Sequence, residues 1–161
     1  MLKIRETIES DRGAIWEIFR EVIVAGETYP LNANSSREDA LTYWFQKGAR
    51  VYVADQSRHL VGSYTLHANQ ASGGAHVANA GFIVAKEGRG QGIGRALGEH
   101  CLNEARRLGF RAMQFNFVVS SNESAVRLWQ DLGMKILGTL PGAFRHPTRG
   151  YVDVYVMFQN L

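Results

Sequence analysis

Gly88-Arg-Gly-Gln-Gly-Ile-Gly94 places four glycines within seven residues, between a β-branched run and a long amphipathic segment. Glycine permits positive φ and a close approach to the backbone, and a β-carbon would obstruct both. A glycine-rich turn that opens a helix presents backbone N–H groups that can bind a phosphate. The stretch therefore predicts a phosphate-binding turn between a strand and a helix, and a flexible loop without a ligand is the alternative.

Two familiar phosphate-binding motifs do not fit this turn. A Walker loop ends in Gly-Lys-Ser/Thr, and no lysine follows these glycines. A dinucleotide fingerprint, G-x-G-x-x-G, would need glycine at Ile93 or a small residue at Arg95. The pattern that fits is R-x-x-G-x-G, from Arg89 to Gly94.

The segments on either side of the turn have clear periodicities. Residues 77–84 read as a strand, and residues 92–108 read as a helix that Gly109 ends. One face of this helix is apolar and carries Ile93, Leu97, Cys101, Ala105 and Leu108. Its position on that face predicts that Cys101 is a core residue rather than a nucleophile.

The rest of the chain reads as alternating strands and helices. We expect, in chain order, a short strand near Ile4, a helix through 15–23, a loop at 25–34, a helix that follows a Ser35-x-x-Glu38 capping box and ends by Gly48, and a hairpin of strands 51–54 and 60–67 around a turn at 55–59. After the glycine turn and its helix we expect a strand through 113–118, a helix at 122–132, and strands at 135–139 and 151–158 joined by a loop. This order predicts one mixed α+β domain over residues 1–161.

Composition narrows the class of protein. With 161 residues, 45% of them hydrophobic and 20% charged, the chain suits one globular domain. We expect a cytoplasmic protein without membrane association, since there is no apolar run of membrane-spanning length and no signal-peptide core. One cysteine and five histidines without metal-binding spacing predict no metal site. The net charge of +3 is scattered, which argues against nucleic acid and favours a small anionic ligand.

A second motif lies about thirty residues after the first. Asn122-Glu-Ser-Ala-Val-Arg-Leu-Trp-Gln-Asp-Leu-Gly133 resembles the N-x-x-A-x-x-L-Y-x-x-x-G-F segment of the Gcn5-related N-acetyltransferase (GNAT) superfamily, and R-x-x-G-x-G resembles its acyl-CoA-binding motif. The resemblance covers nearly the whole chain. It implies a central, mostly antiparallel mixed sheet of seven strands, with helices on both faces and a splay between strands 4 and 5.

The resemblance also implies acetyl-CoA as co-substrate, with no metal. The pantetheine would lie in the splay, where a backbone N–H of strand 77–84 polarises the thioester carbonyl. The pyrophosphate would bind N–H groups of the glycine turn, aided by the helix dipole. The cofactor-binding residues expected on this basis are Phe82, Ile83, Val84, Arg89, Gly90, Gln91, Gly92, Gly94, Arg95 and Asn122.

The chain departs from the family pattern where acid and base would be expected. Trp129 stands where many relatives have a tyrosine that protonates the leaving thiolate, and an indole N–H cannot do so. Strand 77–84 contains no carboxylate to act as base. Tyr155 is then a candidate acid, although a strand tyrosine more often packs, and Asn122 is a candidate to set the geometry at the thioester.

Asparagines remain on the two splayed strands. Asn79 and Asn116, with Asn122, resemble those of the fungal proline-analogue N-acetyltransferases, which acetylate azetidine-2-carboxylate and similar imino acids. We expect Asn79 and Asn116 to bind a small amine that bears a carboxylate; the alternative is that they only satisfy strand edges. Tyr29 and Arg145 complete the expected acceptor site, on the loops 26–30 and 144–149 that should close it.

The leading hypothesis is an acetyl-CoA-dependent N-acetyltransferase for a small amine such as an amino or imino acid, with a homodimer as the candidate oligomeric state. Acetylation of a protein N-terminus or of lysine is one alternative, although bulky residues in both bordering loops would narrow a peptide groove. A non-catalytic acyl-CoA-binding module is another alternative. The absence of the family's tyrosine and of a carboxylate on strand 77–84 favours it.

Overall fold

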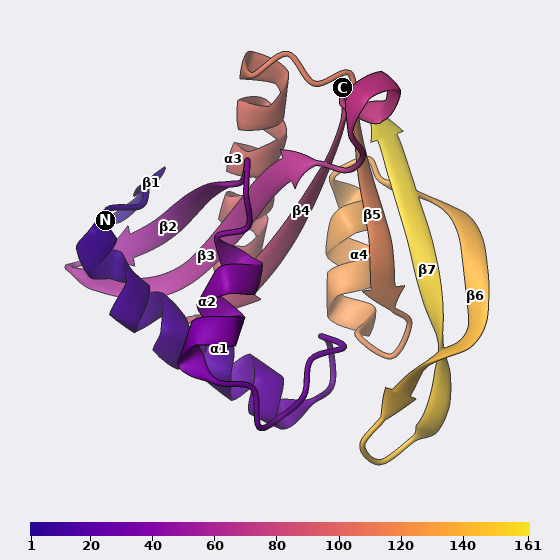
Figure 1. The fold of residues 1–161 in the computed structure, drawn as a ribbon, viewed down its shortest axis with the longest axis horizontal. Helices are drawn as coiled ribbons and strands as arrows, with labels where there is room; N and C mark the ends of the chain where they lie inside the picture. Colours follow the sequence, from indigo (N-terminus) through magenta and orange to yellow (C-terminus); the bar gives the residue numbers. More distant parts are fainter.

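The computed structural model describes residues 1–161, which form a seven-stranded sheet in the order β1-β2-β3-β4-β5-β7-β6 (Figure 1). The strands are β1 Leu2–Glu6, β2 Arg50–Gln56, β3 His59–Ala68, β4 Val77–Val84, β5 Ala112–Val119, β6 Lys135–His146 and β7 Gly150–Asn160. Only β4 and β5 are parallel, and every other neighbouring pair is antiparallel. The predicted α+β class, strand number and strand orientation are confirmed.

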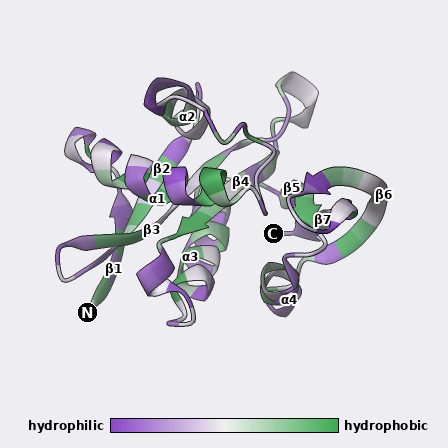
Figure 2. Ribbon diagram, turned by 90° about the horizontal axis from the view of Figure 1, so that it is seen from below, coloured by the Kyte–Doolittle hydropathy of each residue, from purple (hydrophilic) through white to green (hydrophobic).

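Four helices cover the sheet, two on each face (Figure 2). Helices α1 (Arg12–Ala25) and α2 (Arg37–Trp44) enclose one core around Phe19 and Trp44. Helices α3 (Ile93–Arg107) and α4 (Glu123–Asp131) enclose the other, which includes Leu97 and the fully buried Cys101. The apolar face predicted for α3 is therefore its core face. None of the four helices is long and apolar enough to cross a membrane.

The splay between β4 and β5 is the feature that creates the site. These strands pair only at Val77–Ala112 and Ala78–Met113, and beyond that point they separate toward the lower part of Figure 1. On its other side β5 stays paired with β7, with a register shift between Phe115 and Val118. A register shift of this kind bends a strand locally and re-aims its side chains.

The N-cap of α2 lies one residue later than predicted. Ser36, not Ser35, is the N-cap, and its Oγ accepts a hydrogen bond of 3.0 Å from the Asp39 N–H. The helix ends at Trp44 rather than near Gly48. Trp44 is fully buried and its indole N–H donates to Ser63 Oγ on β3, so tertiary packing fixes the end of this helix.

The two hairpins are longer than predicted. Only Ser57 and Arg58 form the β2–β3 turn, both with positive φ, which is typical of a two-residue hairpin loop. The region expected to be a loop after residue 139 is instead the second half of β6, paired with β7 as far as His146. Pro141 is tolerated because β6 is an edge strand and a register shift lies between Leu140 and Phe144.

Candidate active site

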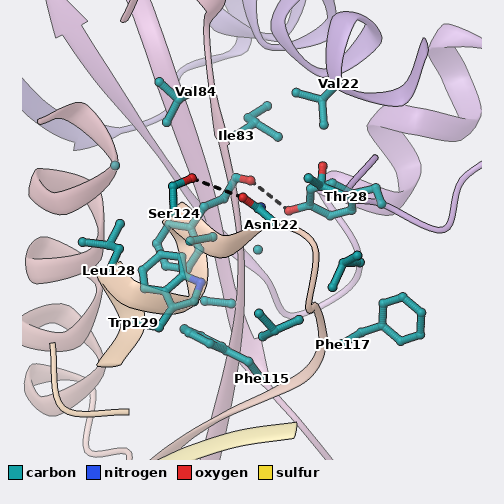
Figure 3. Close-up of a pocket in the computed structure, with 18 of the residues that line it drawn as sticks. Val22, Thr28, Ile83, Val84, Phe115, Phe117, Asn122, Ser124, Leu128 and Trp129 are labelled. Carbon is teal, nitrogen blue, oxygen red and sulfur yellow. Dashed lines mark hydrogen bonds between the residues drawn. The ribbon is translucent and has the colours of Figure 1, made fainter. Parts of the chain in front are cut away.

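A cavity of about 740 Å³ occupies the splay and runs from the start of α3 to the loop between α1 and α2 (Figure 3). This volume lies in the usual range of ligand sites, about 300 to 1,000 Å³. The turn before α3, the start of α4 and one face of β4 line one part of it, the donor end. The α1–α2 loop, α2 and the opposite face of β3 and β4 line the other part, the acceptor end.

Strand alternation directs backbone groups of β4 into this cavity. Val77 accepts from Asn69 N–H and Ala85 donates to Val61 C=O, so odd-numbered residues of β4 bond toward β3. Even-numbered residues must then point their N–H and C=O groups the other way, into the splay. Ala78 lies where β4 pairs with β5. The residues of β4 after Ala78 have no pairing partner on β5.

Side chains occupy two of the backbone groups that face the splay. Asn79 Oδ1 accepts from Ala80 N–H at 2.8 Å, and Tyr29 Oη donates to Phe82 C=O at 3.0 Å. The N–H groups of Phe82 and Val84 remain directed into the splay. They are donors of the kind that stabilises a developing oxyanion, and they lie within the segment predicted for this role.

The start of α3 supplies a second set of donors. Gly92 is the N-cap with φ +78°, and the first helical hydrogen bond runs from Ala96 N–H to Gly92 C=O. The N–H groups of the first turn therefore have no partner within the helix. An added Cβ on Gly90 or Gly92 would meet nothing within 4 Å, so the space in front of these donors is open to an anion.

Some residues in the glycine turn and just after it have structural roles as well. Arg95 forms an ion pair of 2.7 Å with Asp131 of α4, and the amide of Gln91 donates to Glu87 C=O outside the cavity lining. A Cβ on Gly94 would lie 3.5 Å from Leu128 of α4, so this glycine also helps the two helices pack closely. Arg89 is exposed at the cavity and has no ion pair within the chain.

Trp129 forms part of the cavity wall beneath β4 (Figure 3). Its ring centroid lies 4.6 Å from that of Phe82 and 5.1 Å from that of Phe115. Gly98 makes room for it on α3, because a Cβ there would lie 3.0 Å from the indole. Trp129 is thus a packing residue between α3, α4 and the splayed strands, in the place where the resemblance implied a phenol.

Asn122 lies at the start of α4 and lines the cavity (Figure 3). It is the N-cap residue by position, but its side chain makes no capping hydrogen bond. Its Oδ1 instead lies 3.4 Å from the Ser124 hydroxyl. The amide of Asn122 is therefore available on the cavity side of the helix.

Tyr29 defines the acceptor end. Its ring packs against Phe19 and Trp44, and its hydroxyl lies where a Cβ on Gly81 would approach to 2.9 Å. Burial, together with the neighbouring Tyr43 hydroxyl, raises the pKa of Tyr29 above its usual range. Tyr29 is thus a neutral hydrogen-bond donor that ties the α1–α2 loop to β4.

The two candidate asparagines differ in the hydrogen-bond partners of their side-chain amides. Asn79 accepts through Oδ1 from its own strand, which leaves its Nδ2 without a protein partner at the cavity. Asn116 is exposed, with Nδ2 donating to Asn69 Oδ1 at 2.7 Å and Oδ1 accepting from Gln114 at 2.9 Å. Both line the cavity, but only the Asn79 amide nitrogen has no protein partner at all.

Besides Gln91, two further predicted site residues lie outside the cavity lining. Arg145 is exposed on the distal part of β6, because the segment expected to fold over the site is a strand of the β6–β7 hairpin. Tyr155 sits in β7 opposite Val118 and Thr139 and packs against the core of α3 and α4. The geometry gives neither residue a role at the splay.

The cavity also has lining residues that the sequence did not single out. Thr65 and His67 are on β3, directly opposite Gly81 and Asn79 of β4, and they share the face that looks toward α2. Thr28 and Gln46 line the same end. The alternation of residues along β3 predicts that Thr65 and His67 share a face. The sequence pattern does not predict that this face borders a cavity. No group of three or more His, Cys, Asp or Glu side chains could hold a metal ion.

The chain is similar in sequence and in structure to known proteins. The model of the acetyltransferase (GNAT) family matches residues 14–134. N-acetyltransferase aca1 of Schizosaccharomyces pombe is 30% identical over 151 residues, covering 83% of this chain and 72% of the relative. A GCN5-related N-acetyltransferase from Kribbella flavida is 43% identical with a TM-score of 0.95, over 99% of this chain and 98% of that one. The putative acetyltransferase yncA of Salmonella typhimurium, solved with acetyl-CoA, shares the fold at 22% identity and a TM-score of 0.88, over 100% and 94% of the two chains.

Proposed function

The chain belongs to the acetyltransferase (GNAT) family, and we propose that it transfers the acetyl group of acetyl-CoA to the nitrogen of a small amine, an amino or imino acid. The observation that carries this proposal is the continuous cavity in the splay. One end of it offers backbone donors to an anion and to a thioester. The other end is enclosed by bulky neutral side chains and is suited to a small polar molecule.

The donor end supports acetyl-CoA as co-substrate. The free N–H groups around Gly92 and the positive charge of Arg89 suit a pyrophosphate. The N–H groups of Phe82 and Val84 suit the thioester carbonyl, which gains negative charge as the amine attacks. A neutral amine held within about 3 to 3.5 Å of that carbonyl can attack it directly, because the thioester is already activated. Asn122, at the same wall, is proposed to orient the thioester.

The acceptor end supports a small substrate that carries a carboxylate. Tyr29, hydrogen-bonded to Phe82 C=O, and Tyr43 close this part of the cavity. The free Nδ2 of Asn79 can donate to a carboxylate without a buried ion of its own. The likeness to a fungal N-acetyltransferase fits the proline-analogue group.

Release of free thiol from acetyl-CoA tests the function directly. The panel contains azetidine-2-carboxylate, proline, the free amino acids, simple amines without a carboxylate and a lysine peptide. We expect the highest kcat/KM with a free amino or imino acid, because the acceptor end is small and offers a donor to a carboxylate. A preference for the lysine peptide would identify a protein acetyltransferase, and binding of acetyl-CoA without any turnover would identify a binding module.

Asn79→Ala and Asn116→Ala should differ in their effects on the acceptor. Loss of the free Asn79 amide should raise the acceptor KM about tenfold, as expected for one hydrogen bond of about 1.5 kcal/mol. Asn116 already bonds Gln114 and Asn69, so its substitution should change that KM less than threefold, by about 0.6 kcal/mol or less. Steady-state kinetics at saturating acetyl-CoA measure both. Equal acceptor KM and kcat in Asn79→Ala and the parent would end this assignment.

We propose that residues 1–161 act as one N-acetyltransferase domain and that the protein is cytoplasmic. The single cysteine, Cys101, is buried and not in a disulfide, which supports a reducing compartment.

We also propose a homodimer. Its support is the edge strand β6, where Ile136, Leu137 and Leu140 are exposed and suit burial against a second copy.

A further inference from the structure

We propose that His67 is the general base that takes the proton from the acceptor amine, a role that rests on the acetyl transfer proposed above. His67 lies on β3 at the acceptor end and is the imidazole that lines the cavity. The strand next to it, β4, carries no carboxylate. The chain thus places its base on the neighbouring strand, on the face that the acceptor reaches.

The hydrogen bond of His67 determines which ring nitrogen can accept a proton. Its Nδ1 lies 2.9 Å from the carbonyl oxygen of Ala68. A carbonyl only accepts hydrogen bonds, so Nδ1 carries the hydrogen of the neutral ring. Nε2 then has the free lone pair, which is the arrangement that a general base requires.

The other ionisable groups of the cavity are less suited to this role. Tyr29 and Tyr43 have pKa values raised by burial, and Tyr29 already donates its hydrogen to Phe82 C=O. Arg89 and Arg95 are permanently charged and lie at the donor end. Glu27 is the one carboxylate of the lining, and it is exposed on the α1–α2 loop. His67 and Glu27 are therefore the two groups to compare.

His67 is within reach of the predicted acceptor. It pairs directly with Asn79 across β3 and β4, and directly opposite residues have Cβ atoms about 4.5 to 5.5 Å apart. An amino or imino acid whose carboxylate binds Asn79 Nδ2 is thus proposed to bind on the face of the sheet that His67 shares with Asn79. Thr65, two residues earlier on the same face, is 3% exposed and its hydroxyl has no partner. A polar acceptor, or a water bound with it, would satisfy this group as well.

The proton balance is simple. His67 Nε2 takes one proton from the protonated amine, and the freed lone pair attacks the thioester carbonyl. The C–N bond forms, the C–S bond breaks, and the nitrogen loses its second proton as it becomes an amide. That proton ends on the departing thiolate, which leaves as coenzyme A thiol, and His67 returns its proton to solvent. No oxidant, metal or other reactant is consumed.

Rates measured against pH, with azetidine-2-carboxylate or the best acceptor of the panel, test this role in His67→Gln. We expect kcat to fall about 100-fold or more, the usual contribution of a general base. The limb of the parent pH profile that reports the general base should disappear. Free imidazole should restore activity to His67→Ala, which a merely structural role would not allow. Affinity for acetyl-CoA should stay unchanged in both variants.

His59→Gln and Glu27→Gln are the matched controls. His59 lies in the first pair of β3, next to the β2–β3 turn and outside the cavity, so its substitution should leave rate and pH profile intact. Glu27→Gln should keep the limb that His67→Gln loses. A retained limb in His67→Gln, or its loss in Glu27→Gln instead, would overturn the assignment to His67. No transfer by the parent would overturn the proposed function itself, and acetyl-CoA binding then shows whether the fold is intact.

Discussion

Gly92→Val is expected to weaken acetyl-CoA binding at least 100-fold while the protein stays folded. Gly92 holds φ at +78° at the start of α3, and its absent side chain leaves open the space that faces the free N–H groups. Valine there would stand where the pyrophosphate is proposed to bind. Loss of two hydrogen bonds to a charged group, each about 1.5 to 3 kcal/mol, accounts for a factor of that size. Titration calorimetry measures the Kd, and the thermal shift with acetyl-CoA should shrink in parallel.

Gly109→Val separates this effect from backbone strain. Gly109 ends the same helix with φ +88°, and a Cβ there would also meet nothing within 4 Å. Each substitution should therefore cost stability by a similar amount, about 1 to 3 kcal/mol for a non-glycine residue forced into this region. Only Gly92→Val should lose acetyl-CoA. Equal affinities in the two folded variants would show that the anion does not bind at the start of α3.

The donor end could be predicted from the sequence because its determinants are local. The glycine turn, the strand before it and the helix after it follow one another in the chain, from Val77 to Arg107. Backbone N–H groups at a helix start do not depend on distant side chains. The resemblance then supplied the splay, which the pairing of β4 with β5 at only two positions confirms.

The acceptor end was predicted less well because it is assembled from segments far apart in the chain. Tyr29 belongs to the α1–α2 loop and His67 to β3, and nothing local in either segment shows that they line one cavity. Arg145 illustrates the same limit. Pro141 and Gly142 indicated a loop, but pairing with β7 extended β6 past them and carried Arg145 away from the site.

Gly81→Val is expected to lower kcat/KM for the acceptor about 100-fold, a loss of about 2.7 kcal/mol, with little change in acetyl-CoA affinity. A Cβ at this position would lie 2.9 Å from the Tyr29 hydroxyl, which is closer than real Cβ contacts allow. Tyr29 has little room to move, since its ring packs against Phe19 and Trp44. The clash should separate the hydroxyl from Phe82 C=O and disturb both the α1–α2 loop and the adjacent stretch of β4. Gly138→Val is the control, because this β6 glycine has open space around it.

A double-mutant cycle identifies the cause of that loss. Without the Tyr29 hydroxyl, the nearest atoms to an alanine Cβ at position 81 are Thr65 Cγ2 at 3.5 Å and Trp44 Cζ3 at 3.6 Å, both ordinary contacts. Gly81→Ala should therefore impair acceptor turnover in the parent but have almost no further effect in Tyr29→Phe. A coupling of about 1 kcal/mol or more in kcat/KM is expected for residues in direct contact. Additive effects would mean that the acceptor end does not depend on the Tyr29 hydroxyl fitting over Gly81, and that this wall of the cavity is set by other residues.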